Sequence, residues 1–416
     1  MKKILFVEHG QDIKGYAIQA AYELGLDIFI VSNTKIIKLP QGIDEKNVFI
    51  SDTFDSHTLL IDTLNFIEGH NIDLDAVVTF RENCVIPTAD LASAFGLKGI
   101  SSEGARRSSQ NKVMMRHRLK YRKFANQPNY TSLNLHDEKA EHVFANFPKP
   151  CVIKPLFGTA SHGVLFCDNL SNFNVVKNQL LAEVNPSARE IFKKFDGTVI
   201  LEEFKDGALI SVDGIVKDSK LLPLGTLEFV MGNKPYFTQV ASHMPARISP
   251  RIRDLLYDTT QEIISILGFQ FCGIHAEFRV EGEKVWLIEI AARLAGATIH
   301  ETYKRVYGND LVKDSLLNLL NDKTPIFNKS PKNAYHHLVF PNIQNTSILD
   351  SVITPENEMK DVLDLLHFAQ PGSTIQTYPH NPTPILGYLL MGNNSEALQI
   401  KGEEIDKNII ISLKTQ

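Results

Sequence analysis

Short apolar runs alternate with amphipathic stretches over the first hundred residues. KKILFVE, LDIFIVSN and DLDAVVTF each hold a compact run of large apolar side chains, as buried strands do. KGYAIQAAYELG, which ends near Gly25, and PTADLASAFGL have the spacing of helices. Because strands that alternate with helices are typical of a parallel sheet flanked by helices, the pattern predicts an α/β domain at the start of the chain.

Beyond Pro128 the pattern is dominated by strands. PKPCVIKPLFGTASHGVLFCD, residues 148–168, predicts two strands joined by a small, polar, glycine-flanked loop, and further strands follow from TVILEEF onward. Residues 251–269 have the spacing of an amphipathic helix, and ETYKRVYGNDLVKDSLLNLL predicts another helical stretch. Short β-rich runs fill the chain from about residue 332, so α+β architecture is expected after the first domain.

HAEFRVEGEKVWLIEIAAR, residues 275–293, predicts two strands joined by a tight turn. Side chains alternate along a strand, so the two faces of this hairpin differ in character. One face is apolar and carries Ala276, Phe278, Val280, Trp286, Ile288 and Ile290. The other face carries His275, Glu277, Arg279, Leu287, Glu289 and Arg293. If residues 282–284 form a three-residue loop, Glu277 lies directly across from Glu289.

The two facing glutamates have two interpretations. Like charges with Cβ atoms about 4.5–5.5 Å apart destabilise a sheet, whereas a hard divalent cation such as Mg²⁺ binds carboxylate oxygens of this kind. In the alternative, the face is solvated and Arg279 neutralises Glu289 as a diagonal neighbour. The hairpin alone leaves both interpretations open.

Two other segments carry candidate chemistry. Thr79, Arg81 and Glu82 follow AVVTF, at the carboxyl end of a predicted parallel strand, where such sheets bind ligands. Glu82 equally fits an acid in the first turn of a helix. Lys154 precedes FGTASHG, whose backbone N–H groups could surround phosphate oxygens, although an ordinary hairpin loop has a similar sequence. The pattern GxGxxG does not occur in HGQDIKG after the first predicted strand, and GxxxxGK[ST] does not occur in the loop after Lys154.

Composition and charge narrow the class of protein. A chain of 416 residues is long enough for two or three domains. Its net charge of -5 argues against nucleic acid or an anionic membrane as a partner, although residues 106–124 are basic and fit a solvated helix face or a triphosphate site. No run of about 18 apolar residues could span a membrane. The four cysteines are scattered, so a cytosolic protein is expected.

Lys112, the loop at 154–163, LEEF at 201–204 and the glutamate hairpin occur in an order that resembles the ATP-grasp superfamily. More closely, the chain is similar over most of its length to the carboxylate–amine ligases that include bacterial L-amino-acid ligases. The resemblance implies an ATP-grasp fold in four parts. These are an N-terminal Rossmann-like domain at residues 1–100, a first ATP-grasp subdomain at 101–205, a second at 206–330 and a small C-terminal α+β segment at 331–416.

The resemblance also implies a role for each matching residue. ATP phosphates would meet Lys112, Lys154 and the closing loop of Gly158, Thr159, Ser161, His162 and Gly163. The linker that holds adenine corresponds to Glu202, Glu203 and Phe204. Mg²⁺, or Mn²⁺ in its place, would bind Glu277 and Glu289. Catalytic roles are implied for Arg293, Lys154 and His243, and substrate contacts for Glu82, His243, Arg293, Gly296 and Ala297.

Two positions depart from the family pattern and bear on the implied reaction. Leu209 stands where many members use a glutamate for the ribose hydroxyls, and Ala291 where many have an asparagine beyond the second metal ligand. The implied reaction joins an amino-acid carboxylate to an amine, expected to be a second L-amino acid, through an acylphosphate, and releases ADP and phosphate. The alternatives are a carboxylase that activates bicarbonate and a nucleotide-binding regulator without turnover. The resemblance leaves a homodimer open.

Overall fold

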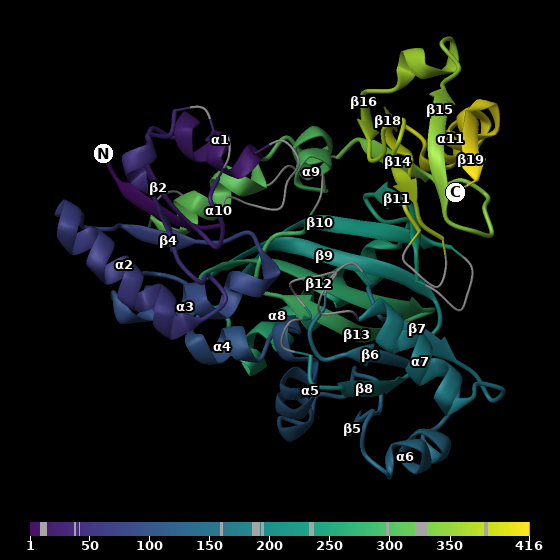
Figure 1. Ribbon diagram of the computed structural model, residues 1–416, viewed down its shortest axis with the longest axis horizontal. Helices are drawn as coiled ribbons and strands as arrows, with labels where there is room; N and C mark the ends of the chain where they lie inside the picture. The colour runs from purple at the N-terminus through teal and green to yellow at the C-terminus, as the bar shows by residue number, and fades with distance from the viewer. Residues whose placement is uncertain are drawn as a thin grey trace.

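The computed structural model describes residues 1–8, 15–36, 39–40, 42–158, 161–184, 192, 195–232, 237–296, 299–320, 331–377 and 382–415. Figure 1 shows a purple N-terminal domain, a long central sheet, a smaller blue unit below it and a yellow-green C-terminal part at the far end of the sheet. Of the helices within these ranges, none combines the length and apolar character that crossing a bilayer requires.

The N-terminal domain is built on a parallel sheet in the order β3-β2-β1-β4. Its strands are β1 (Lys3–Val7), β2 (Asp27–Ser32), β3 (Val48–Ile50) and β4 (Ala76–Val78), and its helices are α1 (Tyr16–Glu23), α2 (Ser56–His70) and α3 (Val85–Ala94). Ile4 and Phe6 enter one apolar core while Leu5 and Val7 enter another. Both faces of β1 are therefore covered, which is why the strand is a continuous apolar run, and the predicted α/β domain is confirmed.

A smaller antiparallel sheet in the order β5-β8-β6-β7 carries the predicted phosphate loop. Its elements are α4 (Ser102–Arg106) and α5 (Lys112–Tyr121), which precede it, then β5 (Tyr130–Asn134), α6 (Ala140–Asn146), β6 (Cys151–Pro155), β7 (Leu165–Cys167), α7 (Phe173–Glu183) and β8 (Thr198–Glu203). Ile153 and Leu201 pack with α6 and α7 on one face. Because side chains alternate, Lys154 and Glu202 point to the other face.

The large sheet has the order β13-β12-β9-β10-β11-β14-β18-β16, and its neighbouring strands are antiparallel. The strands are β9 (Ala208–Lys217), β10 (Lys220–Met231), β11 (Gln239–Met244), β12 (Cys272–Glu281), β13 (Lys284–Ala291), β14 (Asn333–Val339), β16 (Asp364–His367) and β18 (Leu386–Gly392). Helix α8 (Pro250–Leu267) covers part of one face, ends at Gly268 and confirms the helix predicted at residues 251–269. The sheet continues across residue 331, so C-terminal strands extend it.

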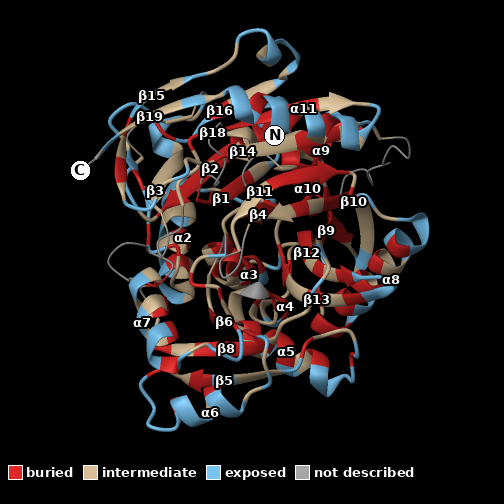
Figure 2. Ribbon diagram, turned by 90° about the vertical axis from the view of Figure 1, so that its right-hand side faces the viewer, coloured by how far each residue is buried: buried red, intermediate tan, exposed pale blue. Residues whose placement is uncertain are grey.

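Two helices and a small sheet complete the fold. The predicted helical stretch after the hairpin is two helices, α9 (Ile299–Tyr307) and α10 (Leu311–Leu319), because Gly308 adopts a φ of 76° and Asp310 caps a new helix. The C-terminal part adds a sheet of β15 (Ser347–Ile353), β17 (Thr374–Ile375) and β19 (Ile410–Thr415), together with α11 (Ser395–Asn408). Figure 2 shows that buried residues concentrate in the sheets and the inner faces of the helices.

The glutamate hairpin has the predicted pairing but not the predicted turn. Glu277 lies opposite Glu289, as expected. However, Glu281 pairs with Lys284, so the loop contains two residues rather than three. A two-residue loop alone would shift the register by one, and every side chain beyond the shift would change faces.

A β-bulge restores the register between the two strands. Glu277 is opposite Glu289 but Phe278 is opposite Leu287, which leaves Ile288 as the extra residue. As a result the predicted faces of β13 are reversed below the bulge. Leu287 is fully buried in the core with Phe278, whereas Ile288 lines a cavity on the other face.

Gly207 generates a testable prediction about the entry into β9. Its φ is 93°, and a Cβ there would lie 2.1 Å from the carbonyl oxygen of Val280. We expect Gly207→Ala to lower the free energy of unfolding by about 2–5 kcal/mol, because left-handed strain and overpacking add. Gly282 has a φ of 59° with nothing within 4 Å of a Cβ, so Gly282→Ala should cost only about 1–2 kcal/mol. Urea unfolding measures both, and equal losses would contradict the packing argument.

Candidate active site

A cavity of about 360 Å³ lies between the smaller sheet and the large sheet. Its size is typical of small-molecule sites. Part of its lining is charged and consists of Lys112, Lys154, Glu202, Glu277 and Glu289. Another part is apolar and includes Leu209, Phe229, Met231, Phe237, Leu338 and Phe340. A ligand with an anionic group and a flat apolar group would match both parts of this lining.

Glu202 lies at the centre of a buried charge cluster. Its carboxylate accepts a hydrogen bond from Arg116 Nε at 2.7 Å and lies 2.5 Å from Lys154 Nζ. Burial raises the pKa of Glu202, but the charges of Arg116 and Lys154 outweigh burial and bring it to about 2. The resemblance includes Glu202 in the linker that holds adenine, and the structure places its carboxylate between two cations.

Sequence reasoning missed Arg116, which is one of the largest fully buried side chains in the described part of the chain. Its Nη2 also donates to the carbonyl oxygen of Ile288 at 2.7 Å, which ties α5 to β13. The available signal was its spacing from Lys112, because residues four apart share one face of a helix. The basic segment 106–124 is therefore only partly a solvated helix face.

Glu277 and Glu289 face each other across β12 and β13, and both line the cavity. Lys112 Nζ lies 3.6 Å from Glu289 Oε2. Burial raises the pKa of Glu289, but the cations Lys112 and Lys154 hold it below its ordinary value. Among the described residues, no group of three or more acids, histidines or cysteines is arranged to hold a metal. Two carboxylates fit Mg²⁺, which usually keeps water and substrate phosphate as its other ligands.

Arg279 does not neutralise Glu289 in the way the alternative interpretation required. Its Nη1 donates to the carbonyl oxygen of Gly207 at 2.8 Å, and its guanidinium lies 5.8 Å from the ring centre of Phe204. The cation that accompanies Glu289 is instead Lys112, which comes from α5.

A chain of buried hydrogen bonds supports Glu277 from behind. His275 Nδ1 lies 2.8 Å from Asp213 Oδ1, and His275 Nε2 lies 3.1 Å from Glu277 Oε1. Asp213 Oδ2 also accepts from Ser211 at 2.6 Å and from the Tyr303 hydroxyl at 2.8 Å. Burial lowers the pKa of His275, but the Asp213 charge and hydrogen bonds raise it to about 10. The sequence placed His275 on the correct face, but Asp213 and Tyr303 are distant in sequence and gave no signal.

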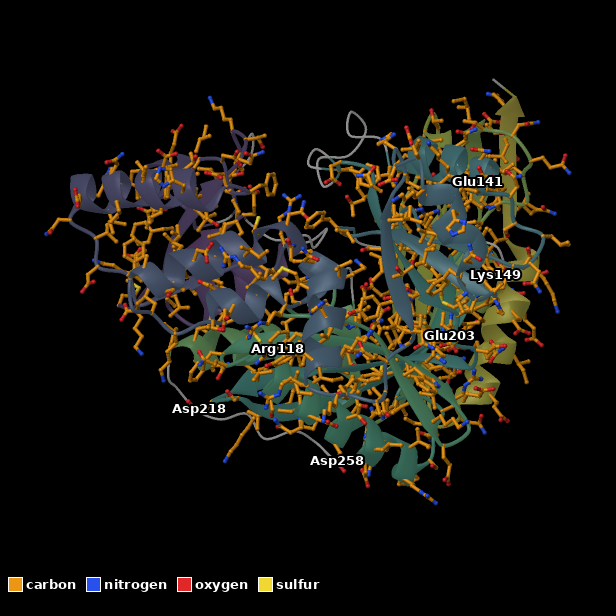
Figure 3. All side chains as sticks on the ribbon, turned by 90° about the horizontal axis from the view of Figure 1, so that it is seen from below. Arg118, Glu141, Lys149, Glu203, Asp218 and Asp258 are labelled. Atoms are coloured by element: carbon orange, nitrogen blue, oxygen red, sulfur yellow. The ribbon has the colours of Figure 1, made fainter. Side chains whose placement is uncertain are left out.

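The predicted adenine linker borders the cavity. Glu203 Oε2 accepts from Asn129 Nδ2 at 2.9 Å, and its other oxygen pairs with Lys205. The Phe204 ring lies 6.3 Å from that of Phe237. Figure 3 shows the side chains that crowd around the labelled Glu203. Since the Glu203 carboxylate already has two partners, backbone groups and aromatic rings are the parts of this linker that remain suited to a base.

The two positions that depart from the family pattern lie in different surroundings. Leu209 lines the cavity, and the polar residues Thr238 and Gln239 line it as well. Ala291 is buried and belongs to the end of β13. The cavity therefore has polar lining that could meet a sugar although Leu209 offers no hydrogen bond.

Arg293 and Glu82 are brought together from distant parts of the sequence. Arg293 Nε lies 2.6 Å from Glu82 Oε2, and Glu82 is buried. The charge of Arg293 also lowers the pKa of Glu289, after the larger effects of burial and of Lys112. Gly296 follows and is half-buried, while the predicted substrate residue Ala297 lies outside the described residues.

The predicted phosphate loop borders the same cavity. Gly158, Ser161 and His162 line it, whereas Thr159 lies outside the described residues. The N–H of Gly163 donates to Glu183 Oε2 at 3.0 Å. Burial raises the pKa of Glu183 to about 7 against the opposing effect of that hydrogen bond.

His243 is not placed with these residues. It lies on β11 opposite Glu228, on the face of the sheet away from Phe229 and the cavity. Its Nδ1 lies 2.8 Å from Ser395 Oγ of α11, and its ring contacts Tyr335. The strand alternation decides this position, because residues 242 and 243 point to opposite faces.

The cavity lies between two α+β units, with Lys112 and Lys154 on one side and Glu277 and Glu289 on the other. This arrangement is typical of folds that bind a nucleotide between two subdomains. Comparison with known families agrees. Residues 147–301 match the ATP-grasp domain, and residues 18–99 match the ATP-grasp N-terminal domain. The chain therefore belongs to the ATP-grasp superfamily and has the ATP-grasp fold.

Individual relatives are distant in sequence but similar in fold. The alanine–anticapsin ligase of Bacillus subtilis (strain 168) is 22% identical over 82% of this chain and 78% of its own length. Carnosine synthase 1 of Mus musculus is 23% identical over 76% of this chain but only 39% of its own length. The L-amino acid ligase of Bacillus licheniformis has a TM-score of 0.82, with 19% identity, over 100% of this chain and 99% of its own.

The pKa of Glu202 generates a prediction about acid stability. Its folded value of about 2 is below the ordinary 4.5, so its stabilising effect is complete above pH 4.5 and is lost as pH falls through about 2. We expect this carboxylate to contribute roughly 3 kcal/mol of the pH dependence over that range.

Comparison of variants measures that contribution. The slope of unfolding free energy against pH should be shallower in Glu202→Gln than in the wild type. The exposed Glu283, which pairs with Arg251, provides the matched control, and Glu283→Gln should retain the wild-type slope. Identical slopes for all three proteins would show that Glu202 is not held ionised by its two cations.

Proposed function

We propose that this protein is an ATP-dependent ligase that joins an amino-acid carboxylate to an amine, expected to be a second L-amino acid. The observation that carries the proposal is the facing pair Glu277 and Glu289 beside Lys112 and Lys154 in one cavity. This arrangement suits a metal-bound triphosphate. The ATP-grasp family and the ligase relatives support the choice of reaction.

In the first step, a carboxylate oxygen of the donor attacks the γ-phosphorus of ATP, and the bond to ADP breaks. The product is an acylphosphate. Mg²⁺ held by Glu277 and Glu289 would neutralise charge on the phosphate oxygens. Lys112 and Lys154 supply fixed positive charge on the same side of the cavity, so the protein acts mainly by positioning and electrostatics.

In the second step, the amine of the acceptor attacks the acyl carbon, the bond to phosphate breaks and the amine loses a proton. Arg293 is suited to stabilise the oxyanion that forms, because its guanidinium is fixed by the Glu82 carboxylate. Water would hydrolyse the acylphosphate. The loop that includes Gly158 and Ser161 borders the cavity and is suited to exclude water from the reaction.

One experiment separates this proposal from its alternatives. The protein is incubated with ATP, Mg²⁺ and the twenty amino acids, singly and in pairs, and phosphate release is followed. Release that depends on a pair supports the ligase. Release that depends on bicarbonate supports a carboxylase. Tight ATP binding without release under any condition supports a regulator.

The metal pair gives the sharpest prediction for turnover. Glu289→Gln should reduce phosphate release by about 100- to 1000-fold, because an electrostatic contact to the transferred group is lost. Its cooperative thermal unfolding should persist, since the apolar core lies on the other face of the hairpin. Glu283→Gln on the exposed turn of the same hairpin is the control and should keep wild-type activity. Wild-type turnover in Glu289→Gln would remove the metal assignment.

The hydrogen-bond chain behind Glu277 gives a prediction about metal affinity. His275→Asn breaks the link between Asp213 and Glu277, so we expect Mn²⁺ to bind about 10- to 100-fold more weakly to the ADP-loaded protein. Electron paramagnetic resonance measures free Mn²⁺ without requiring turnover. His337→Asn, on β14 and outside the cavity lining, should leave the affinity unchanged. Equal affinity in wild type and His275→Asn would exclude a positioning role.

A further inference from the structure

A second cluster of fixed polar side chains lies at the carboxyl edge of the N-terminal sheet. Glu8 directly follows β1, and Arg81 comes shortly after β4. In the order β3-β2-β1-β4, the chain leaves β1 toward β2 and β3 and returns on the other side at β4. Open parallel sheets bind ligands in the crevice where the strand order reverses in this way.

Glu8 is fixed in place, and each of its carboxylate oxygens already accepts two hydrogen bonds within the protein. It is 2% exposed and adopts a φ of 64°, which is unusual for a residue other than glycine. Its Oε1 accepts from the Asn33 N–H at 2.7 Å and from Thr53 Oγ1 at 2.8 Å. Its Oε2 accepts from Ser32 Oγ at 3.2 Å and from Arg81 Nη1 at 3.3 Å. Glu8 is therefore an internal anchor for Arg81.

Glu8 orients Arg81, but it accepts a hydrogen bond only from Nη1 of the guanidinium. The Arg81 backbone N–H donates to Thr79 Oγ1 at 3.1 Å, and Thr79 in turn donates to the Val7 carbonyl at 2.8 Å. The Arg81 side chain as a whole is 30% exposed. Its Nε is buried and, within the described part of the chain, has no hydrogen-bond partner. A guanidinium has five N–H donors in a rigid fork, so donors remain for an anion.

The position of Arg81 relates it to the proposed reaction centre. It is next in sequence to Glu82, whose carboxylate lies 2.6 Å from Arg293 Nε. Glu82 is also held through its backbone carbonyl by Gln110. Arg81 thus stands one residue from the contact by which the N-terminal domain reaches Arg293, at an edge that is partly open to solvent.

The proposed reaction requires a second anion site. The donor carboxylate is consumed when the acylphosphate forms, but an acceptor amino acid keeps an α-carboxylate that does not react. Burying that charge without a cation would be costly, and an arginine fork binds a carboxylate well. We propose that Arg81, held by Glu8, binds the α-carboxylate of the acceptor amino acid. The inference rests on the proposed function and selects amino acids over simple amines as acceptors.

The acceptor test compares each accepted amino acid with its α-amide in the wild-type protein. Loss of the carboxylate should lower kcat/KM for the acceptor about 10- to 100-fold, the range for one hydrogen bond to a charged group. Arg81→Met should lower kcat/KM for the free acid by a similar factor, mainly through KM. It should also bring the acid and the amide close to equal, and Arg81→Lys should restore part of the preference. Equal use of acid and amide by the wild type would overturn the inference.

Hydroxylamine distinguishes a failure of this inference from a failure of the proposed function. It is an uncharged acceptor that converts an acylphosphate into a hydroxamate, so it needs no carboxylate site. Hydroxamate formation in Arg81→Met should change much less than reaction with the amino-acid acceptor. Absence of hydroxamate from every donor with the wild type would refute the proposed function itself. Parallel losses with both acceptors would show that Arg81 is only structural and would overturn the inference.

Arg106 provides the matched control for Arg81. Its Nη1 and Nη2 donate to the two Asp90 carboxylate oxygens at 2.8 and 2.7 Å, so its guanidinium fork is already occupied by a carboxylate. Arg106→Met should therefore leave the preference for the free acid over the amide unchanged. A loss of that preference in Arg106→Met equal to the loss in Arg81→Met would overturn the assignment to Arg81.

Discussion

The structure depends on pairing charges that are held out of water in one cavity. Glu202 is buried between Arg116 and Lys154, and any one of the three left alone would be strongly destabilising. Because these residues come from β8, α5 and β6, their pairing also fixes the relative positions of those elements. The cavity can keep lysines ready for an anion only because an internal acid balances them in its absence.

The two ion pairs differ in the distance between their charged atoms. Glu202 and Arg116 are 2.7 Å apart, whereas Lys112 and Glu289 are 3.6 Å apart. In the first pair Arg116 is fully buried and does not line the cavity, and Glu202 is almost fully buried, so a ligand is not suited to replace Arg116. The second lies in the cavity lining, where a metal ion could take Glu289 and a phosphate could take Lys112. The cluster thus combines a permanent pair that supports the fold with a looser pair suited to exchange.

Sequence reasoning succeeded where short-range rules decide the outcome. The α/β start and the helix that ends at Gly268 follow from periodicity and turn signals. The facing of Glu277 and Glu289 was predicted correctly but from the wrong turn, because a bulge compensates for the shorter loop. The bulge that leaves Ile288 unpaired was not predictable, because the alternation of apolar and polar residues does not show where an extra residue is inserted. Arg116 was likewise missed, since only the tertiary fold brings it to Glu202. Pairs of residues distant in sequence carry no local pattern.

The C-terminal part shows why the cavity is a property of the whole chain. Strand β14 pairs with β11 and extends the large sheet, and Leu338 from its end lines the cavity with Phe340. A sheet edge at β11 would expose unpaired backbone groups next to the nucleotide site. Extension by β14 covers that edge and supplies apolar lining at once. The same extension places α11 against the face that carries His243, which is why that histidine meets Ser395 and not the cavity.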